Sequence, residues 1–291
     1  MPIHNLTDTL AAYDEGRVHV QRFYKASNVT TGDGRWIDWA LASGQPAYDA
    51  RIGVAGQMNP VVAARNDAIW FPDILPTQER RLKRIVLRTL AGGTNQATLD
   101  GILYDLVGVY PLIDGDSTDL QEFTNDDPLP RYSDGAGIIP VLVNHVAPMV
   151  ASCDGTMTYT CTDDVVRSVG IGVSLGTIGN VVSTQRNVTS FGSLGLPTNG
   201  GRGIKAINSI QFNTAPGGLF AIYMLKPIMT IQNNDGALVA EKIATEKFLA
   251  INHAWHYPRI RDGAHLGFFL RPNGGGRNIA SVYGYLEFIW G

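Results

Sequence analysis

The sequence contains six histidines, and none has the spacing of a metal site. Metal centres built on β-barrels commonly use a His-x-His pair followed by a glutamate, and the chain has no His-x-His. His253 and His256 are close enough to share one helical face, but the chain runs on into Tyr257-Pro258, which favours a polar loop. We therefore expect no cofactor, and no metal bound by the four histidines that come closest to a set, which are His145, His253, His256 and His265.

The cysteines and the main acidic run also lack a chemical signature. Cys153 and Cys161 flank a turn at Asp154-Gly155 and have no paired histidine, which predicts ordinary sheet positions rather than a catalytic thiol or a disulfide framework. The run 114–119 resembles the start of a calcium loop. The bidentate glutamate at the twelfth position is missing, because Glu122 comes too early. This run is therefore predicted to be a solvated acidic loop.

Other enzyme motifs are missing from the sequence, and its composition favours a protein with partners. No Gly-x-Ser-x-Gly, P-loop or dinucleotide fingerprint is present, so we expect no catalytic residue and no enzyme activity. The net charge of −3 gives no global attraction to nucleic acid or to an acidic membrane surface. Charged residues make up 17% of the chain, below the usual quarter, which indicates a surface partly covered by protein. We find no signal peptide and no long apolar span, and we expect folding in a reducing cytoplasm.

The only dense basic run lies at residues 79–84 and is extended by Arg88. On a strand its alternate members face opposite sides. Three uses fit such a run: a solvated strand, a surface that pairs with acidic loops of a neighbouring subunit, and contact with nucleic acid or lipid headgroups. Arg81, Lys83 and Arg84 are therefore candidate assembly contacts.

The chain also repeats itself. Pro130-Arg131-x-x-Asp134-Gly135-Ala136 returns 128 residues later as Pro258-Arg259-x-x-Asp262-Gly263-Ala264, and 150–159 returns as 279–288. Weaker matches pair 52–54 with 171–173, 61–66 with 181–187, and 75–77 with 196–198. Their shared order and slowly drifting offset indicate an internal duplication with loop insertions. We predict an N-terminal arm over 1–50, a first copy over 51–162 and a second copy over 163–291.

Within a copy the periodicity is that of β-strands. Tyr283, Tyr285 and Glu287 alternate with a second set of side chains at 284, 286 and 288, as in a strand with one packed face. Roughly eight short strands in each copy predict an all-β fold of two tandem jelly-roll-like sandwiches with little helix. A helix is predicted at 7–13 in the arm, and 235–249 in the second copy is predicted to be a helix or an insertion between strands.

The arm carries several large apolar residues that a short segment cannot bury alone. We therefore expect it to dock on another surface, such as a neighbouring subunit, and to be dispensable for the folding of both sandwiches. Its candidate assembly contacts are Phe23, Trp36, Ile37 and Trp39, with Leu6 and Leu10 as further apolar anchors.

Taken together, this plan resembles the double jelly-roll major capsid proteins of tailless icosahedral bacteriophages, of the tectivirus and corticovirus type. The residues that carry the resemblance are 65–66, 75–76 and the strand 82–87, followed in the second copy by 186–187, 196–197 and the strand 204–212. The resemblance implies a homotrimer whose six barrels form a pseudo-hexagonal tile of a shell. It also implies a protein made in the host cytoplasm and placed in the virion, with other virion proteins, the genome or an internal lipid layer as further partners.

Two other functions stay open. A decoration or cement protein of a tailed-phage capsid would also be a charge-poor β trimer with an extended arm. A two-domain glycan-binding or glycan-cleaving protein is the third candidate. Glycan cleavage needs two facing carboxylates, and glycan recognition would use exposed aromatic rings, for which the candidates are Trp255, Tyr257, Tyr283 and Tyr285.

Overall fold

The computed structural model describes most of the chain. The described residues are 3, 6–26, 36–47, 51, 53–63, 68–91, 98–145, 149–173, 202–233, 239–243, 257–273 and 279–291. Several residues used above lie outside these ranges, namely 52, 65–66, 181–187, 196–198, Trp255, His253 and His256.

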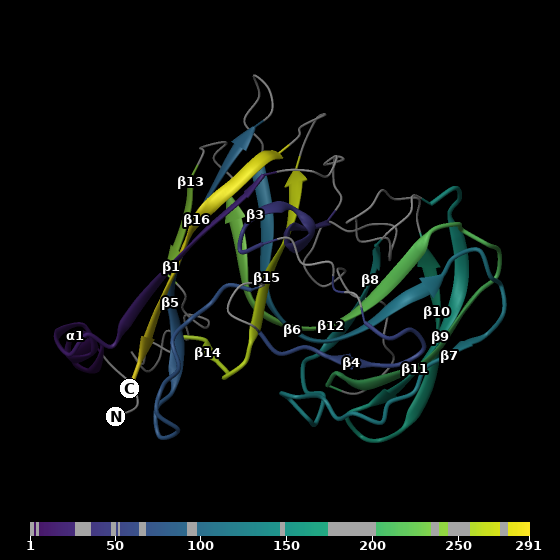
Figure 1. The fold of residues 1–291 in the computed structure, drawn as a ribbon, viewed down its shortest axis with the longest axis horizontal. Coiled ribbons are helices and arrows are strands. Elements are labelled where there is room, and N and C mark those ends of the chain that lie inside the picture. The colour runs from purple at the N-terminus through teal and green to yellow at the C-terminus, as the bar shows by residue number, and fades with distance from the viewer. Residues whose placement is uncertain are drawn as a thin grey trace.

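Strands dominate the described chain and form three sheets, which confirms the predicted all-β class (Figure 1). The first outer sheet has the order β13 (Val239–Ile243), β5 (Arg80–Ala91), β16 (Ile279–Trp290), β1 (Val18–Ala26) and β3 (Ser43–Gln45), with β14 (Arg259–Ile260) beside β5. The second outer sheet has the order β10 (Val166–Val173), β9 (Cys153–Cys161), β11 (Ile204–Phe212) and β7 (Gln121–Glu122). The central sheet has the order β2 (Ile37–Asp38), β15 (His265–Asn273), β6 (Thr98–Asp114), β12 (Leu219–Asn233) and β8 (Ile139–Asn144), with β4 (Asn59–Pro60) beside β6.

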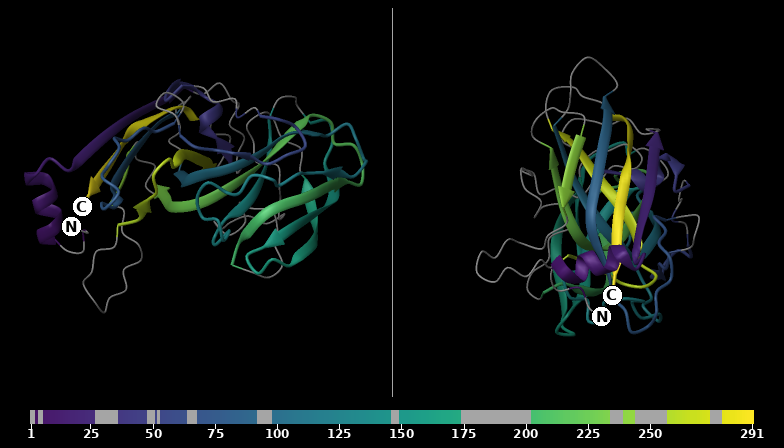
Figure 2. Two further views of the ribbon diagram at one scale, coloured as in Figure 1. Left: turned by 60° about the horizontal axis from the view of Figure 1, so that its bottom comes forward. Right: turned by 90° about the vertical axis from the view of Figure 1, so that its left-hand side faces the viewer.

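Both outer sheets cover the same face of the central sheet, at its two ends. Leu103 of β6 packs in the core under the first outer sheet, whereas Tyr110, further along the same strand, packs in the core under the second. We call these two halves lobe 1 and lobe 2, and the long strands β6 and β12 run through both (Figures 1 and 2). Along β6, side chains that alternate with those of the two cores, such as Tyr104, point to the opposite face of the central sheet and form a third cluster there. Residues 101–110 are all buried because both faces of β6 are covered.

The two predicted copies do not map one to one onto the two lobes. In lobe 1, β5 from the first copy pairs with β16 from the second. In lobe 2, β9 from the first copy pairs with β11 from the second. The predicted boundary at residue 162 falls in the turn between β9 and β10, which pair with each other in one sheet. The strands of the copies interleave because β6 and β12 carry the chain from one lobe to the other.

Similar local features nevertheless occur in the two lobes. An added Cβ at Gly284 would clash with the carbonyl oxygen of Val86, and one at Gly155 would clash with that of Gln211. In both lobes, therefore, a glycine lets one strand press against the backbone of the next. The Asp-Gly turns recur as well, with φ of +72° at Gly135 and +68° at Gly263.

The helix predicted in the arm is confirmed, whereas the helix alternative for 235–249 is wrong at the residues of that segment that the structure describes, 239–243. Helix α1 spans Leu6–Asp14, as the 7–13 pattern predicted, and a short 3-10 helix, η1, spans Trp39–Leu41. Within 235–249 the structure has a strand, β13, which pairs with β5. Pairing with an edge strand outweighs local helix propensity there, and Val239 and Ile243 are β-branched residues that suit a sheet. No helix among the described residues has the length and apolarity needed to cross a membrane.

The N-terminal arm is part of lobe 1 rather than an appendage to it. Strand β1 pairs along its whole length with β16, and β2 pairs with β15. A buried ion pair joins Arg51 to Asp38 at 3.1 Å, and the Tyr104 hydroxyl donates to the same carboxylate at 2.8 Å. The expectation that lobe folding does not need the arm is therefore corrected, because the arm fills part of the core.

Candidate interaction surface

The apolar residues predicted to contact a neighbouring subunit are buried by the chain itself. Phe23 is 4% exposed and Trp39 is 3% exposed, and both pack in the lobe 1 core. Trp36 and Ile37 are 5% and 1% exposed, and the Trp36 ring lies 5.2 Å from the guanidinium of Arg271. The structure therefore uses these four side chains to dock the arm on its own lobe.

The three predicted basic contacts lie on the outer side of β5, and each is paired within the chain. Arg81 bonds Glu79 at 2.7 Å, while Lys83 and Arg84 lie 3.5 and 3.0 Å from the buried carboxylate of Glu287. The hydroxyl of Tyr13 from α1 also donates to Glu287. Burial raises the pKa of Glu287, and burial together with the neighbouring charge of Arg84 lowers the pKa of Lys83. This cluster holds α1 against the sheet, so most of its charge is compensated internally.

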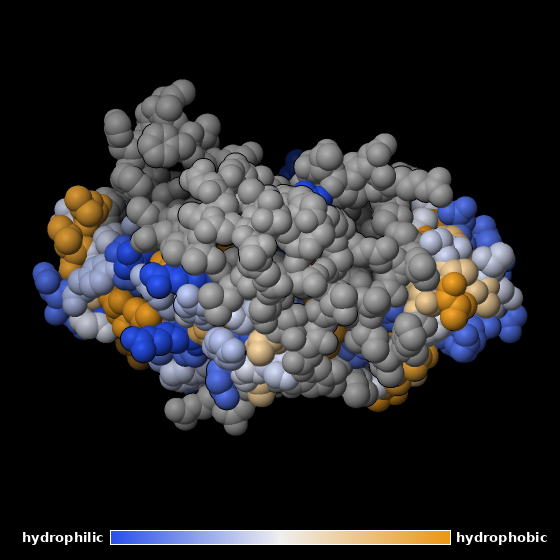
Figure 3. All heavy atoms as spheres, turned by 90° about the horizontal axis from the view of Figure 1, so that it is seen from above, coloured by the Kyte–Doolittle hydropathy of each residue, from blue (hydrophilic) through white to orange (hydrophobic). Residues whose placement is uncertain are grey.

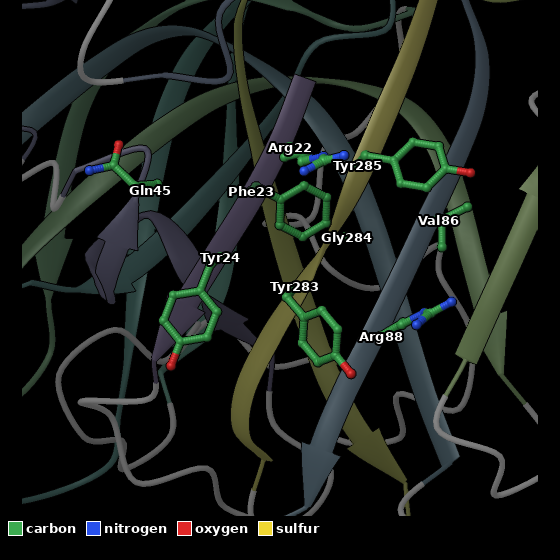
Figure 4. Close-up of a pocket in the computed structure, with 9 residues that line it drawn as sticks. All are labelled: Arg22, Phe23, Tyr24, Gln45, Val86, Arg88, Tyr283, Gly284 and Tyr285. Atoms are coloured by element: carbon green, nitrogen blue, oxygen red, sulfur yellow. The ribbon is translucent and has the colours of Figure 1, made fainter. Parts of the chain in front are cut away.

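Further along the same sheet lies a groove of about 650 Å³, within the usual range for binding pockets (Figure 4). We call it the tyrosine–arginine groove. Its lining comes from β1, β3, β5 and β16, and it consists of Arg22, Phe23, Tyr24, Gln45, Val86, Arg88, Tyr283, Gly284 and Tyr285.

The groove combines aromatic faces with two available cations. Tyr24 is 50% exposed, and Tyr283 and Tyr285 are partly exposed on the neighbouring strand. Arg22 and Arg88 are exposed, and neither forms an ion pair with any described residue. The lining residues include no carboxylate, histidine or thiol, so the groove is suited to binding an apolar group flanked by anions rather than to acid–base catalysis.

The sheet backbone explains the shape of this groove. Gly284 pairs with Phe23 on one side and Leu87 on the other, and its missing side chain leaves room for the Phe23 ring underneath. Tyr283 and Tyr285 therefore stand on the outer face on either side of a residue without a side chain. The sequence alternation identified these two tyrosines, but it gave no signal for Arg22, Tyr24 or Arg88, which reach the groove only through strand pairing.

The other candidate residues lie elsewhere. Tyr257 is 7% exposed, which removes it from an exposed aromatic platform. His145 and His265 are buried, and the described residues contain no group of three or more histidine, cysteine or carboxylate side chains placed to hold a metal. Burial raises the pKa of Cys153 to about 11, with Asp154 adding to the shift, so this thiol stays protonated near neutral pH.

Comparisons with known proteins leave the family open. No family model matches the chain, and no curated protein matches it. A structure of the infectious bursal disease virus Gt strain is similar at 12% identity with a TM-score of 0.16, covering 94% of this chain and 81% of that one. The T13 IBDV viral particle gives the same identity and TM-score over 93% of this chain and 77% of that one. Because these TM-scores are so low, the function proposed below rests on the chain's own residues.

Proposed function

We propose that the chain is a virion structural protein, namely a major capsid protein whose copies form trimeric, pseudo-hexagonal capsomers of an icosahedral bacteriophage shell. The observation that carries this proposal is the pair of lobes, each with its own outer sheet packed on one central sheet (Figure 1). Two similar lobes in each of three copies give six similar units around an axis, which close-pack in a shell.

An internal duplication is part of this proposal. The pairing of β5 with β16 corresponds to that of β11 with β9, and the pairing of β6 with β15 corresponds to that of β12 with β8. The close-packed glycines and the two Asp-Gly turns fall at matching places in this scheme. These correspondences support a common origin of the lobes, although each outer sheet combines strands from both predicted copies.

The surface also supports an assembling protein. Leu6 and Leu10, four residues apart on α1, are 66% and 56% exposed. In lobe 2, Val150 is 77% and Val166 is 57% exposed. Figure 3 shows apolar atoms exposed at both ends of the described molecule. Such residues favour burial by neighbouring copies, and Leu6 and Leu10 are the predicted arm anchors that remain free for this role.

The experiment is to purify the chain and to record its mass by analytical ultracentrifugation and its assemblies by negative-stain electron microscopy. We expect trimers that assemble into closed shells. A stable monomer at micromolar concentration would contradict the proposal. Trimers that never close into shells, but attach to another preformed shell, would favour the decoration protein instead.

The three tyrosines of the groove favour glycan binding as a second candidate function. Exposed aromatic rings in a groove are the usual platform for a sugar ring, and Arg22 and Arg88 would suit an acidic sugar. Glycan-array binding that is lost on Tyr283→Ala, in a chain that stays monomeric, would support this candidate over the capsid protein.

A further inference from the structure

Lobe 2 carries an exposed acidic surface whose carboxylates form no ion pair with any lysine or arginine of the described chain. We call it the acidic edge, and it consists of Asp114, Asp116, Asp119 and Glu122, which lie on and beside the turn that Gln121 closes. No lysine or arginine occurs between Arg88 and Arg131, and none of these carboxylates forms an ion pair with a described residue. No ion pair with a described residue therefore compensates the negative charge of the acidic edge.

Local hydrogen bonds fix the shape of this edge. The Gln121 side chain bonds both the backbone NH and the carbonyl of Asp114, each at 2.8 Å, and closes the turn. Gln211 of the neighbouring strand donates to the carbonyl of Thr118 at 3.1 Å. A contact made by this edge would therefore lose little conformational entropy, because the turn is already ordered.

An apolar side chain projects from the middle of the acidic edge. Leu120 is 54% exposed and lies directly after Asp119 and two residues before Glu122. The tyrosine–arginine groove has the complementary arrangement, with aromatic rings and Val86 along its lining and with Arg22 and Arg88, which form no ion pair with a described residue. An apolar tip flanked by carboxylates thus matches an apolar groove flanked by arginines.

The two complementary surfaces lie on different lobes, toward opposite ends of the long axis (Figure 1). From this arrangement we infer that the acidic edge of one copy docks in the tyrosine–arginine groove of a second copy. Leu120 then lies against the tyrosines, and the flanking carboxylates face Arg22 and Arg88. The contact is head to tail, because it joins two different surfaces of the chain. Such contacts form a closed ring when the rotation from one copy to the next divides a full turn evenly, as one third of a turn does for a trimer. This inference rests on the proposed function and supplies the contact that the proposal needs.

A single-stranded nucleic acid is the rival occupant, since tyrosines stack on bases and arginines bind phosphates. A nucleic acid track uses a continuous row of available cations. The neighbouring cations on β5, Arg81, Lys83 and Arg84, are already paired with Glu79 and Glu287. The groove therefore offers two local cations, which suits a short acidic segment of protein better than a phosphate backbone.

The experiment is a charge exchange measured by sedimentation velocity on the full chain. Arg22→Glu with Arg88→Glu places acids in the groove, and Asp116→Lys with Asp119→Lys places bases on the edge. Each double variant is expected to weaken self-association at least about tenfold, because it sets like charges against each other. Combining all four changes restores opposite charges and is expected to recover most of the association. Arg202→Glu and Asp163→Lys, exposed positions beside the turn between β9 and β10 and at the other end of β11 from Gln211, serve as matched controls that are expected to leave association unchanged.

The outcomes separate this inference from the proposed function. If the wild-type chain does not self-associate, both are overturned. If shells form and the folded double variants associate normally, or the combined variant does not recover, only the docking inference is overturned. Binding of a fluorescent oligothymidylate that is lost in the arginine variants, with association unchanged, would assign the groove to nucleic acid instead.

Discussion

Each lobe has its own outer sheet, and the two sheets differ in where the strand beside their central strand comes from. In lobe 2, β9 lies between β11 and β10, and β10 follows it directly in the chain. In lobe 1, the corresponding strand β16 lies between β5 and β1, and β1 comes from the N-terminal arm. The arm therefore supplies to lobe 1 the strand that residues 166–173 supply to lobe 2. Under the proposed duplication, a segment without a sequence repeat therefore holds a repeated position in the fold.

The lobes also differ on their outer faces. Tyr283 and Tyr285 of lobe 1 correspond to Asp154 and Thr156 of lobe 2 under the proposed duplication. The inward residues of the same strands stay alike, as Phe288 and Tyr159 show, since both are buried in their cores. Each of these strands thus places a buried aromatic ring in its own core, whereas outward-facing tyrosines lie on β16 of lobe 1 and not on β9 of lobe 2.

Removing β1, the strand that the arm supplies to lobe 1, should lower the stability of the protein the most. Deletion of residues 1–26 removes β1, uncovers one side of β16 and takes Phe23 out of the core, so we expect lobe 1 to lose its cooperative unfolding transition. Phe23→Ala alone should cost about 3–5 kcal/mol of unfolding free energy. Circular dichroism during thermal and urea unfolding measures both. A deletion of 1–16, which keeps β1, is the control, and equal stability of the 1–26 deletion would refute the role of the arm.

The repeated Pro-Arg motif offers the next test, because its two arginines have different surroundings. Arg131 forms a buried two-point contact with Asp105, at 2.9 and 2.7 Å, whereas Arg259 pairs with Glu79 at the surface. Arg131→Ala leaves a buried carboxylate without its partner and should cost about 3–5 kcal/mol. Arg259→Ala should cost less than about 1 kcal/mol. Urea unfolding of both variants decides this, and similar losses would show that the motif has the same structural role in both lobes.

A smaller effect is expected from the matched glycines. Gly284→Ala and Gly155→Ala each press a methyl group on a neighbouring carbonyl oxygen, and we expect each to cost about 1–3 kcal/mol. Equal losses of unfolding free energy in the two variants would support the proposed duplication of the lobes. Gly170→Ala is the control, because an added Cβ there meets nothing within 4 Å. A neutral Gly284→Ala would contradict the close approach of β16 to β5.

The smallest expected effect concerns alkaline pH. Burial raises the pKa of Tyr132 to about 12, with a contribution from Asp105. Because the folded-state pKa lies above the unfolded value, the stability that this group contributes is present below about pH 10 and is lost as the pH rises toward 12. We expect the melting temperature to fall over this range, and to fall less in Tyr132→Phe. An unchanged slope in that variant would contradict the assignment.

The sequence predicted the local features better than the pairing between distant strands. The alternation of side chains predicted β9 and β16, and the 7–13 pattern predicted α1. The repeated Pro-Arg-x-x-Asp-Gly motif predicted two similar turns. The sequence patterns missed β13, because an edge strand is defined by its neighbour and not by its own propensity.

The arm and the groove were missed for the same reason. The apolar residues of the arm were recognised as anchors, but their partner proved to be the chain's own core. Arg22 of β1 and Arg88 of β5 lie on either side of β16 and are more than sixty residues apart in the sequence. No local pattern can bring such residues together, because strand order in a sheet is set by long-range packing.

An electron cryomicroscopy map of the assembly formed by the purified full chain would show directly whether its copies build a shell and which surfaces they bury. We predict closed particles built from trimers, in which the tyrosine–arginine groove of lobe 1 is covered by the acidic edge of a neighbouring copy. Isolated two-lobed monomers, or particles in which this groove faces solvent, would contradict the account.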